Sequence, residues 1–243
     1  MHRFFIPKEW FENDKVKITD DPLYQIGYVL RLKPTDRIIV LDNSGWEFEV
    51  ELEWLTKKEA QGKVISKKPG KGEPVVKITL YQALLKSDRF ELALQKCVEL
   101  GITAIVPFIS ERCVIKNPSG SKMERWQKII REAAEQSERS ILPTLHSVVS
   151  FEEACDTANK PALLLWEEEN SKGLKQILQN PPLKTAKTIS LFIGPEGGFP
   201  ESEVKLAQKH GIAIASLGHR ILRAETAGLA AVSAILYEKD EME

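Results

Sequence analysis

The last quarter of the chain, Leu191 to Gly228, constrains the fold more than any other stretch. It begins within an apolar run, Thr188 to Ile193, that is too short for a helix and rich in Ile, Leu and Phe, which predicts a buried strand. The run stops at Gly194-Pro195-Glu196-Gly197-Gly198, where adjacent glycines allow a positive φ and a close approach by another group. Pro200 is typical of a helix start, and Gly211 of a helix stop.

The same unit then repeats. Ile212 to Ser216 is a second short apolar run, Leu217 to Arg223 is a second glycine-containing loop, and a helix is expected from Ala224 to Glu238. Two consecutive strand–loop–helix units predict parallel strands with both loops at their carboxyl ends, the edge where open α/β sheets bind ligands. A pocket lined by both loops is therefore the first functional hypothesis.

The composition of the first loop limits the kinds of ligand that it could bind. The loop has neither the Lys and Ser/Thr of a phosphate-binding P-loop nor the G-x-G-x-x-G spacing of a dinucleotide site. It carries Glu196 instead, which suits a neutral or cationic ligand held by backbone amides better than a triphosphate. On spacing alone, a tight turn whose glycines only permit packing is an equal alternative.

Two motifs carry a resemblance to a known family. GPEGGF at Gly194–Phe199 and LGHRILRAETA at Leu217–Ala227 resemble the RsmE family of the SPOUT class, S-adenosylmethionine (SAM)-dependent enzymes that methylate N3 of a uridine in small-subunit ribosomal RNA. Further segments fit the family pattern in order: Arg3-Phe4-Phe5, Lys86 to Gly101, Pro107, Arg112, Glu132 to Arg139, and Pro143. One departure is Cys113, which stands where the family has serine. The resemblance covers nearly the whole chain.

Charge and composition argue against several classes of function. The net charge of the 243 residues is −1, so binding to nucleic acid would need a local positive face. Three scattered cysteines without a C-x-x-C pair indicate buried thiols in a reducing compartment, and four histidines without ligand spacing argue against a metal site. The amino terminus lacks the apolar segment of a signal peptide, and no stretch is long enough to span a membrane, so we expect a soluble cytoplasmic protein.

The chain divides into two predicted domains. Residues 1–72 contain short strand-like runs and one helical segment, which fits a small β-barrel, and Lys67 to Gly72 is a polar, turn-forming linker. Residues 73–243 alternate strands and helices, which predicts a parallel α/β domain. The family resemblance implies that the barrel is PUA-like and binds RNA. It also implies that the second domain ends in a trefoil knot, whereas periodicity alone predicts an ordinary doubly wound sheet.

The resemblance also implies a donor site built from the knot loops. In it, glycines and backbone amides approach SAM closely, and they have little freedom to lose on binding. The cofactor-binding residues expected are Leu165, Ile193, Gly194, Gly197, Gly198, Leu217, Gly218, Ile221, Leu222 and Thr226.

Two side chains are candidates for the chemistry. Methylation needs the uridine N3 in line with the methyl group and without its proton. Arg223 is predicted to stabilise the resulting negative charge on the base or to hold a phosphate. The alternative is a salt bridge to Glu225 or to the helix end. Glu196 is a candidate proton acceptor, and an equal alternative is that it only fixes its own loop.

RNA phosphates have four candidate contacts: Arg3, Lys86, Arg112 and Arg139. Arg139 could instead join an ion-pair ladder with Arg131 and Glu135 on one helix face, and Phe4 and Phe5 are expected in the barrel core. Small residues along the final helix fit both a core position and a homodimer interface.

The partner predicted from the resemblance is 16S rRNA, and the low net charge favours the assembled small subunit over bare RNA. Two rivals remain: methylation of another RNA atom such as a ribose 2′-hydroxyl, and a non-catalytic RNA-binding assembly factor.

Overall fold

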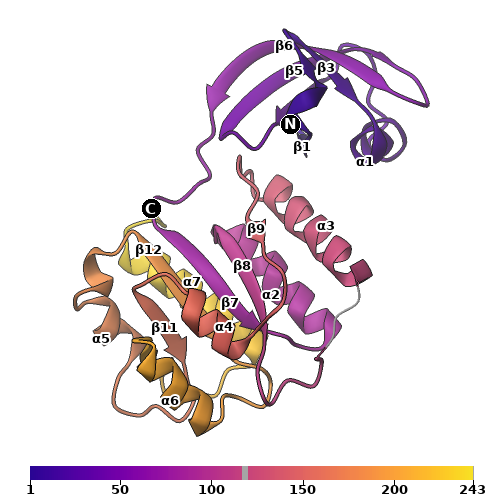
Figure 1. Ribbon diagram of the computed structural model, residues 1–243. Helices are drawn as coiled ribbons and strands as arrows, with labels where there is room; N and C mark the ends of the chain where they lie inside the picture. Colours follow the sequence, from indigo (N-terminus) through magenta and orange to yellow (C-terminus); the bar gives the residue numbers. More distant parts are fainter. Residues whose placement is uncertain (117–119, 243) are drawn as a thin grey trace. The chain divides into compact units, whose positions relative to one another are not determined.

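The computed structural model describes residues 1–116 and 120–242 (Figure 1). The chain forms two compact units. Residues 1–73 and 134–142 make up the first, and residues 74–133 and 143–243 make up the second. Each unit has its own sheet.

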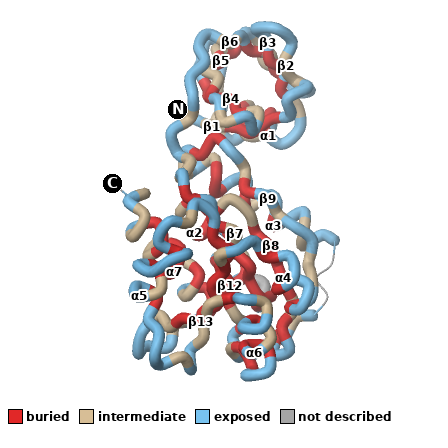
Figure 2. Tube along the Cα trace, turned by 60° about the vertical axis from the view of Figure 1, so that its left-hand side comes forward, coloured by how far each residue is buried: buried red, intermediate tan, exposed pale blue. Residues whose placement is uncertain are grey.

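The first unit is built on a six-stranded sheet in the order β1-β4-β5-β6-β3-β2. Its strands are β1 (Arg3–Phe5), β2 (Phe11–Glu12), β3 (Lys15–Ile18), β4 (Arg37–Leu41), β5 (Trp46–Leu55) and β6 (Ala60–Pro69), with helical turns η1 (Lys8–Trp10), α1 (Asp20–Tyr24) and η2 (Gln25–Val29). The β1–β4 pair is parallel and the others are antiparallel. The sheet curls (Figure 2), but its two short edge strands do not pair with each other among the described residues, so it is a half-barrel and not a closed barrel.

Alternation along these strands fills the inside of the curl. Ile38, Val40, Val50 and Leu52 are buried in one cluster with Phe4, which confirms Phe4 as a core residue of this sheet. Phe5 is equally buried, at 2% exposure, but it does not belong to that cluster. A pleated strand points alternate side chains to one face, which is why this apolar set can share a core.

Residues 134–142 belong to the first unit because specific hydrogen bonds hold them there. The backbone N–H of Phe5 donates to the Glu135 carboxylate at 2.8 Å, and the backbone N–H of Leu142 donates to Oδ1 of Asn43 at 2.6 Å. The linear pattern of the sequence did not reveal this long-range grouping.

The second unit is a parallel α/β structure, which confirms that part of the predicted fold class. Its strands are β7 (Lys77–Ala83), β8 (Ala104–Ile109), β9 (Thr144–Leu145), β10 (Val149–Ser150), β11 (Ala162–Leu165), β12 (Thr188–Ile193) and β13 (Ala213–Ala215). Its helices are α2 (Ser87–Leu100), α3 (Gly120–Gln136), α4 (Phe151–Thr157), α5 (Leu174–Leu178), the turn η3 (Leu183–Thr185), α6 (Glu201–Lys209) and α7 (Ala224–Glu238). The strand order is β10-β8-β7-β12-β11-β13, and β9 pairs with β8.

The order of the last three strands positions the site. β11 lies between β12 and β13, and all three run parallel. The loops after them, 166–173, 194–200 and 216–223, therefore leave the sheet at the same edge. Helices α2 and α7 pack against each other on one face, and α4 packs with α6 on the other (Figure 1).

Candidate functional site

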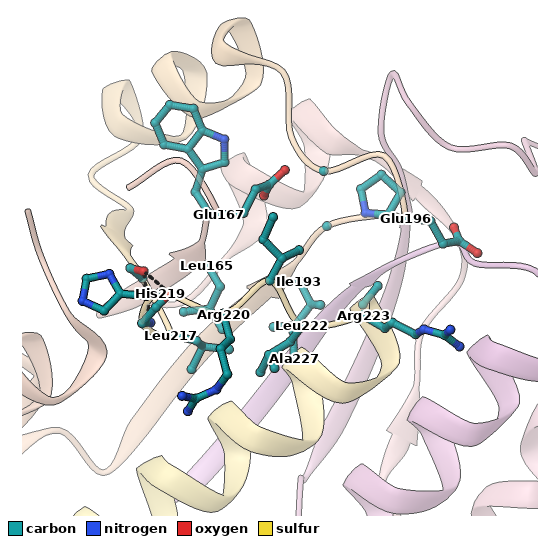
Figure 3. A pocket seen from close by; sticks show the side chains of 18 of the residues that line it. Leu165, Glu167, Ile193, Glu196, Leu217, His219, Arg220, Leu222, Arg223 and Ala227 are labelled. Atoms are coloured by element: carbon teal, nitrogen blue, oxygen red, sulfur yellow. Dashed lines mark hydrogen bonds between the residues drawn. The ribbon is translucent and has the colours of Figure 1, made fainter. Parts of the chain in front are cut away.

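A cavity of about 350 Å³ opens in the second unit at the carboxyl ends of β11, β12 and β13 (Figure 3). Most of the predicted cofactor residues line it: Leu165, Ile193, Gly194, Gly198, Leu217, Gly218, Ile221 and Leu222. Gly197 and Thr226 do not. The prediction that both C-terminal loops share one pocket is therefore confirmed by the geometry.

The glycine loop is shaped by close contacts. A Cβ at Gly194 would lie 2.9 Å from the Phe199 ring, and Gly198 has φ +67°. The Trp166 indole N–H donates to the Phe199 carbonyl at 3.2 Å, which ties the loop after β11 to the loop after β12. At Gly197, the side chain of Arg112 takes the space, and its guanidinium donates to the Gly197 carbonyl at 2.9 Å.

The second loop supplies the opposite wall. Gly218 has φ +103°, and its N–H donates to the Ser216 hydroxyl at 3.1 Å. Apolar side chains of Leu165, Ile193, Leu217, Leu222 and Ala227 face the cavity. This combination of apolar walls and close backbone is typical of a small-molecule site.

Glu196 and Arg89 form a charged pair at the cavity. Glu196 accepts a hydrogen bond from the Lys86 backbone N–H at 3.2 Å and lies 3.6 Å from the Arg89 guanidinium, both through Oε1. Its Oε2 has no such partner within the described residues. The carboxylate therefore fixes the glycine loop to the start of α2 and still has a free oxygen.

Arg223 also lines the cavity, just before α7. Within the described residues its guanidinium forms no ion pair, so the alternative salt bridge to Glu225 is absent. Glu225 is buried, and its Oε2 has no hydrogen-bond partner. A cation without a protein partner at a cavity is available to a ligand.

Several lining residues were not singled out from the sequence. Arg89 comes from α2, far from both loops in the chain, so no local pattern could place it there. Arg220, in contrast, lies inside the second motif close to Arg223, and that proximity was a usable signal. Asn170 and His219 also line the cavity.

The four predicted RNA contacts separate into two pairs. Lys86 and Arg112 are exposed and hold the glycine loop through the bonds described above. The prediction that Arg3 and Arg139 contact RNA phosphates is wrong. Arg3 pairs with Glu47 at 2.6 Å with both side chains 8% exposed, and the side chain of Arg139 is 1% exposed and pairs with Glu73 at 2.7 Å. Neither guanidinium faces solvent, so neither is free to contact a phosphate.

Other chemical sites are not indicated by the part of the chain described. Cys97, Cys113 and Cys155 are free and buried, as predicted, and burial raises the pKa of the Cys97 thiol to about 12. Residues 1–116 and 120–242 contain no cluster of three side chains able to hold a metal ion. Over the same ranges, no helix has both the length and the apolar character to cross a membrane.

Comparison with known proteins identifies the family. The family model for an RNA methyltransferase domain matches residues 71–236. Ribosomal RNA small subunit methyltransferase E of Synechocystis is 37% identical over 97% of this chain and 78% of that protein, and the Bacillus subtilis protein of that name is 34% identical over 99% and 98%. The chain belongs to the ribosomal RNA small subunit methyltransferase E family. The predicted resemblance and enzyme class are confirmed.

Solved structures of similar proteins agree with this family assignment. The family member from Neisseria gonorrhoeae bound to S-adenosyl methionine has a TM-score of 0.88 at 33% identity, covering 98% of this chain and 97% of that one. A methyltransferase from Legionella pneumophila in complex with SAM has a TM-score of 0.88 at 32% identity, covering 97% and 96%. The predicted cofactor is thereby confirmed for the family.

Proposed function

We propose that this protein transfers a methyl group from SAM to N3 of a uridine in 16S rRNA, with the cavity between the two C-terminal loops as its donor site. One observation carries the proposal. The cavity joins an apolar, glycine-lined wall to a guanidinium, that of Arg223, that has no ion-pair partner within the described residues. Such a site offers one region for a flat ring and another for a group that becomes negative.

The residues present fit the donor. Backbone groups of Leu217, Gly218 and Leu222 would hold the adenosine part, between the side chains of Leu165 and Ile193. Gly194 and Gly198 line the same space, and a Cβ at Gly198 would meet the side chain of Glu167, which also lines it. Gly197 and Thr226 would then act through the shape of their segments, since neither reaches the cavity.

The chemistry assigns roles to two side chains. Bound SAM supplies a methyl group on a positively charged sulfur, which is already electrophilic. Uridine N3 becomes nucleophilic only when it loses its proton, and Arg223 would stabilise the negative charge that then spreads to the base oxygens. The free Oε2 of Glu196 is our candidate for the proton acceptor, because Oε1 is already engaged.

The chain path around the cavity supports a knotted donor site. The chain passes from β12 beyond β11 to β13 at the sheet edge, and α7 then returns to pack on β7 and β12. This return crosses the edge where loops 166–173 and 194–200 leave the sheet. We infer that the carboxyl-terminal segment threads this region as a trefoil knot in a domain of residues 73–243.

RNA would be held by more than the cavity. Lys86 and Arg112, both exposed and bonded to the glycine loop, are the remaining candidates for phosphates. Residues 1–72 would act as a PUA-like RNA-binding domain. The net charge of −1 favours an assembled small subunit, which presents RNA in a fixed shape, as the substrate in the cytoplasm. The small residues of α7 would form part of a homodimer interface.

The test is methyl transfer from labelled SAM to small subunits that lack the modification, followed by identification of the nucleoside by mass spectrometry. We expect 3-methyluridine. A 2′-O-methylated nucleoside would contradict the assignment of the atom. Equal methylation of naked 16S rRNA would contradict the assembled subunit as substrate, and absence of SAM binding would support an assembly factor instead.

A further inference from the structure

The two carboxylates that line the cavity are in different situations. Glu196 is engaged by the start of α2. Glu167, in the loop after β11, lines the cavity with an exposed side chain and makes no hydrogen bond and no ion pair within the described residues. An ionised carboxylate can accept several hydrogen bonds, so Glu167 has unused capacity at a ligand site.

The position of the Glu167 carboxylate depends on Gly198. A Cβ built at residue 198 would lie 1.7 Å from Oε1 of Glu167 and 2.7 Å from its Cδ. The carboxylate thus occupies the space that any side chain at 198 would need. The absence of a side chain at this position of the glycine loop lets a carboxylate from the neighbouring loop enter the cavity.

We propose that Glu167 binds the ribose of the methyl donor, accepting hydrogen bonds from its 2′- and 3′-hydroxyls. This inference rests on the donor site proposed above. In Figure 3, Glu167 lies between the side of the cavity with Leu165 and Leu217 and the side with Glu196 and Arg223. The ribose occupies the corresponding place in SAM, between the adenine and the reacting sulfur.

Carboxylate chemistry supports the ribose over the sulfonium as the partner. Two oxygens on one carboxylate match two neighbouring hydroxyls, and hydrogen bonds to an ionised acceptor are stronger than neutral ones. A carboxylate placed against the sulfonium would stabilise its positive charge before the reaction, which lowers its reactivity. A contact with the ribose secures the donor without that cost.

The experiment measures binding of S-adenosylhomocysteine and of its 2′-deoxy form by calorimetry, to the wild type and to Glu167→Gln. We expect the wild type to prefer the ribose form by about tenfold or more, the effect of one hydrogen bond to a charged group. In Glu167→Gln the preference should fall to about twofold. Glu168→Gln is the matched control, because it removes the same charge from the next residue, which does not line the cavity.

The outcomes separate the alternatives. A wild type that binds both forms equally overturns the inference while leaving the donor site in place. A wild type that binds neither overturns the proposed function as well. 5′-Methylthioadenosine, which lacks the amino-acid part, is the third probe. If Glu167→Gln weakens S-adenosylhomocysteine but not this probe, the carboxylate binds the ammonium group and the ribose assignment is wrong.

Discussion

Gly198 and Gly211 share a backbone conformation but differ in their surroundings, and this pair separates conformational strain from site geometry. Their φ values are +67° and +70°, yet a Cβ at Gly198 meets Glu167 whereas a Cβ at Gly211 meets nothing within 4 Å. Either alanine variant should lose about 1–2 kcal/mol of stability through the left-handed conformation. Only Gly198→Ala should also displace the carboxylate and weaken S-adenosylhomocysteine, by about tenfold. Denaturant titration and calorimetry measure the two effects, and equal affinity losses would contradict this account.

Substitution of Arg223 should lower the rate of methyl transfer more than the affinity for the donor. Because its guanidinium has no ion pair within the described residues, Arg223→Ala leaves no buried carboxylate without its cation, and the fold should remain. We expect the methylation rate constant to fall by about a hundredfold or more, while affinity for S-adenosylhomocysteine changes by less than about threefold. Single-turnover assays and calorimetry give the two numbers. A fall in donor affinity as large as the fall in rate would make Arg223 a donor-binding residue instead.

Glu47 makes the stability of the first unit depend on pH. Burial opposes ionisation of Glu47, but the hydrogen bond and charge of Arg3, with Lys68, hold the pKa of its carboxyl below its usual value. Its contribution is therefore present above the unfolded pKa of about 4.3 and is lost as the pH falls through the folded pKa.

Glu47→Gln should cost the first unit about 3–5 kcal/mol at pH 7, because Arg3 is left buried without its partner. The difference between the variant and the wild type should shrink as the pH falls below the unfolded pKa of about 4.3 and through the lower folded pKa, where the wild-type carboxyl becomes protonated as well. Urea titrations at pH 7 and across the acid range test this. A difference that does not change with pH would show that the charge of Glu47 is not what stabilises the unit.

These residues also show what a sequence can reveal. Gly194 and Leu217 could be placed in one pocket because each follows a predicted strand of a parallel pair, and the loops after parallel strands meet at one edge of the sheet. The buried positions of Arg3 and Arg139 could not be predicted, because their ion-pair partners, Glu47 and Glu73, are distant in sequence and become adjacent only in the folded unit.

At the level of elements, α6 positions the loop after β8. Glu203 of α6 is buried, and it accepts hydrogen bonds from the Ser110 hydroxyl at 2.7 Å and from the Glu111 backbone N–H at 2.9 Å. The next residue in that loop is Arg112, which donates to the Gly197 carbonyl. Glu203 thus reaches the glycine loop through Arg112, as a positioning residue.

Glu203→Ala should leave two donors unpaired and cost about 2–3 kcal/mol, with a loss of methylation that exceeds any loss of S-adenosylhomocysteine binding. Glu201→Ala is the matched control on the same helix, because its ion pair with Lys205 is exposed to solvent and contributes little to stability. Denaturant titration, calorimetry and single-turnover assays compare the two variants. Equal behaviour of the two would show that Glu203 does not position the loop.

Elements near the site were the most predictable part of the fold. The predicted strand Thr188–Ile193 and helix Ala224–Glu238 match β12 and α7, because an apolar run ended by glycine and a run of helix formers are local signals. The sequence pattern from Leu145 to Val149 predicts a single strand, but the structure has two short strands here, β9 and β10, both paired with β8. Pairing with a common neighbour decides such short strands, and periodicity does not report it.

At the scale of the whole molecule, the division into two units predicts where a ligand stabilises the protein. The cavity is lined only by residues of the second unit. A ligand that binds only the folded form adds about 2.7 kcal/mol of stability at a hundred times its dissociation constant, which slows exchange through global opening by about a hundredfold. S-adenosylhomocysteine should therefore slow hydrogen exchange of the most protected amides in β7, β11 and β12, and leave those in β4 and β5 unchanged.

Exchange measured by mass spectrometry at several ligand concentrations tests this. The slowing in the second unit should follow the logarithm of ligand concentration, since each tenfold increase above the dissociation constant adds the same free energy. Glu168→Gln should behave as the wild type. If β4 and β5 slow to the same extent as β12, the two units unfold as one cooperative body, and the stability that the donor supplies at the cavity is shared by the half-barrel.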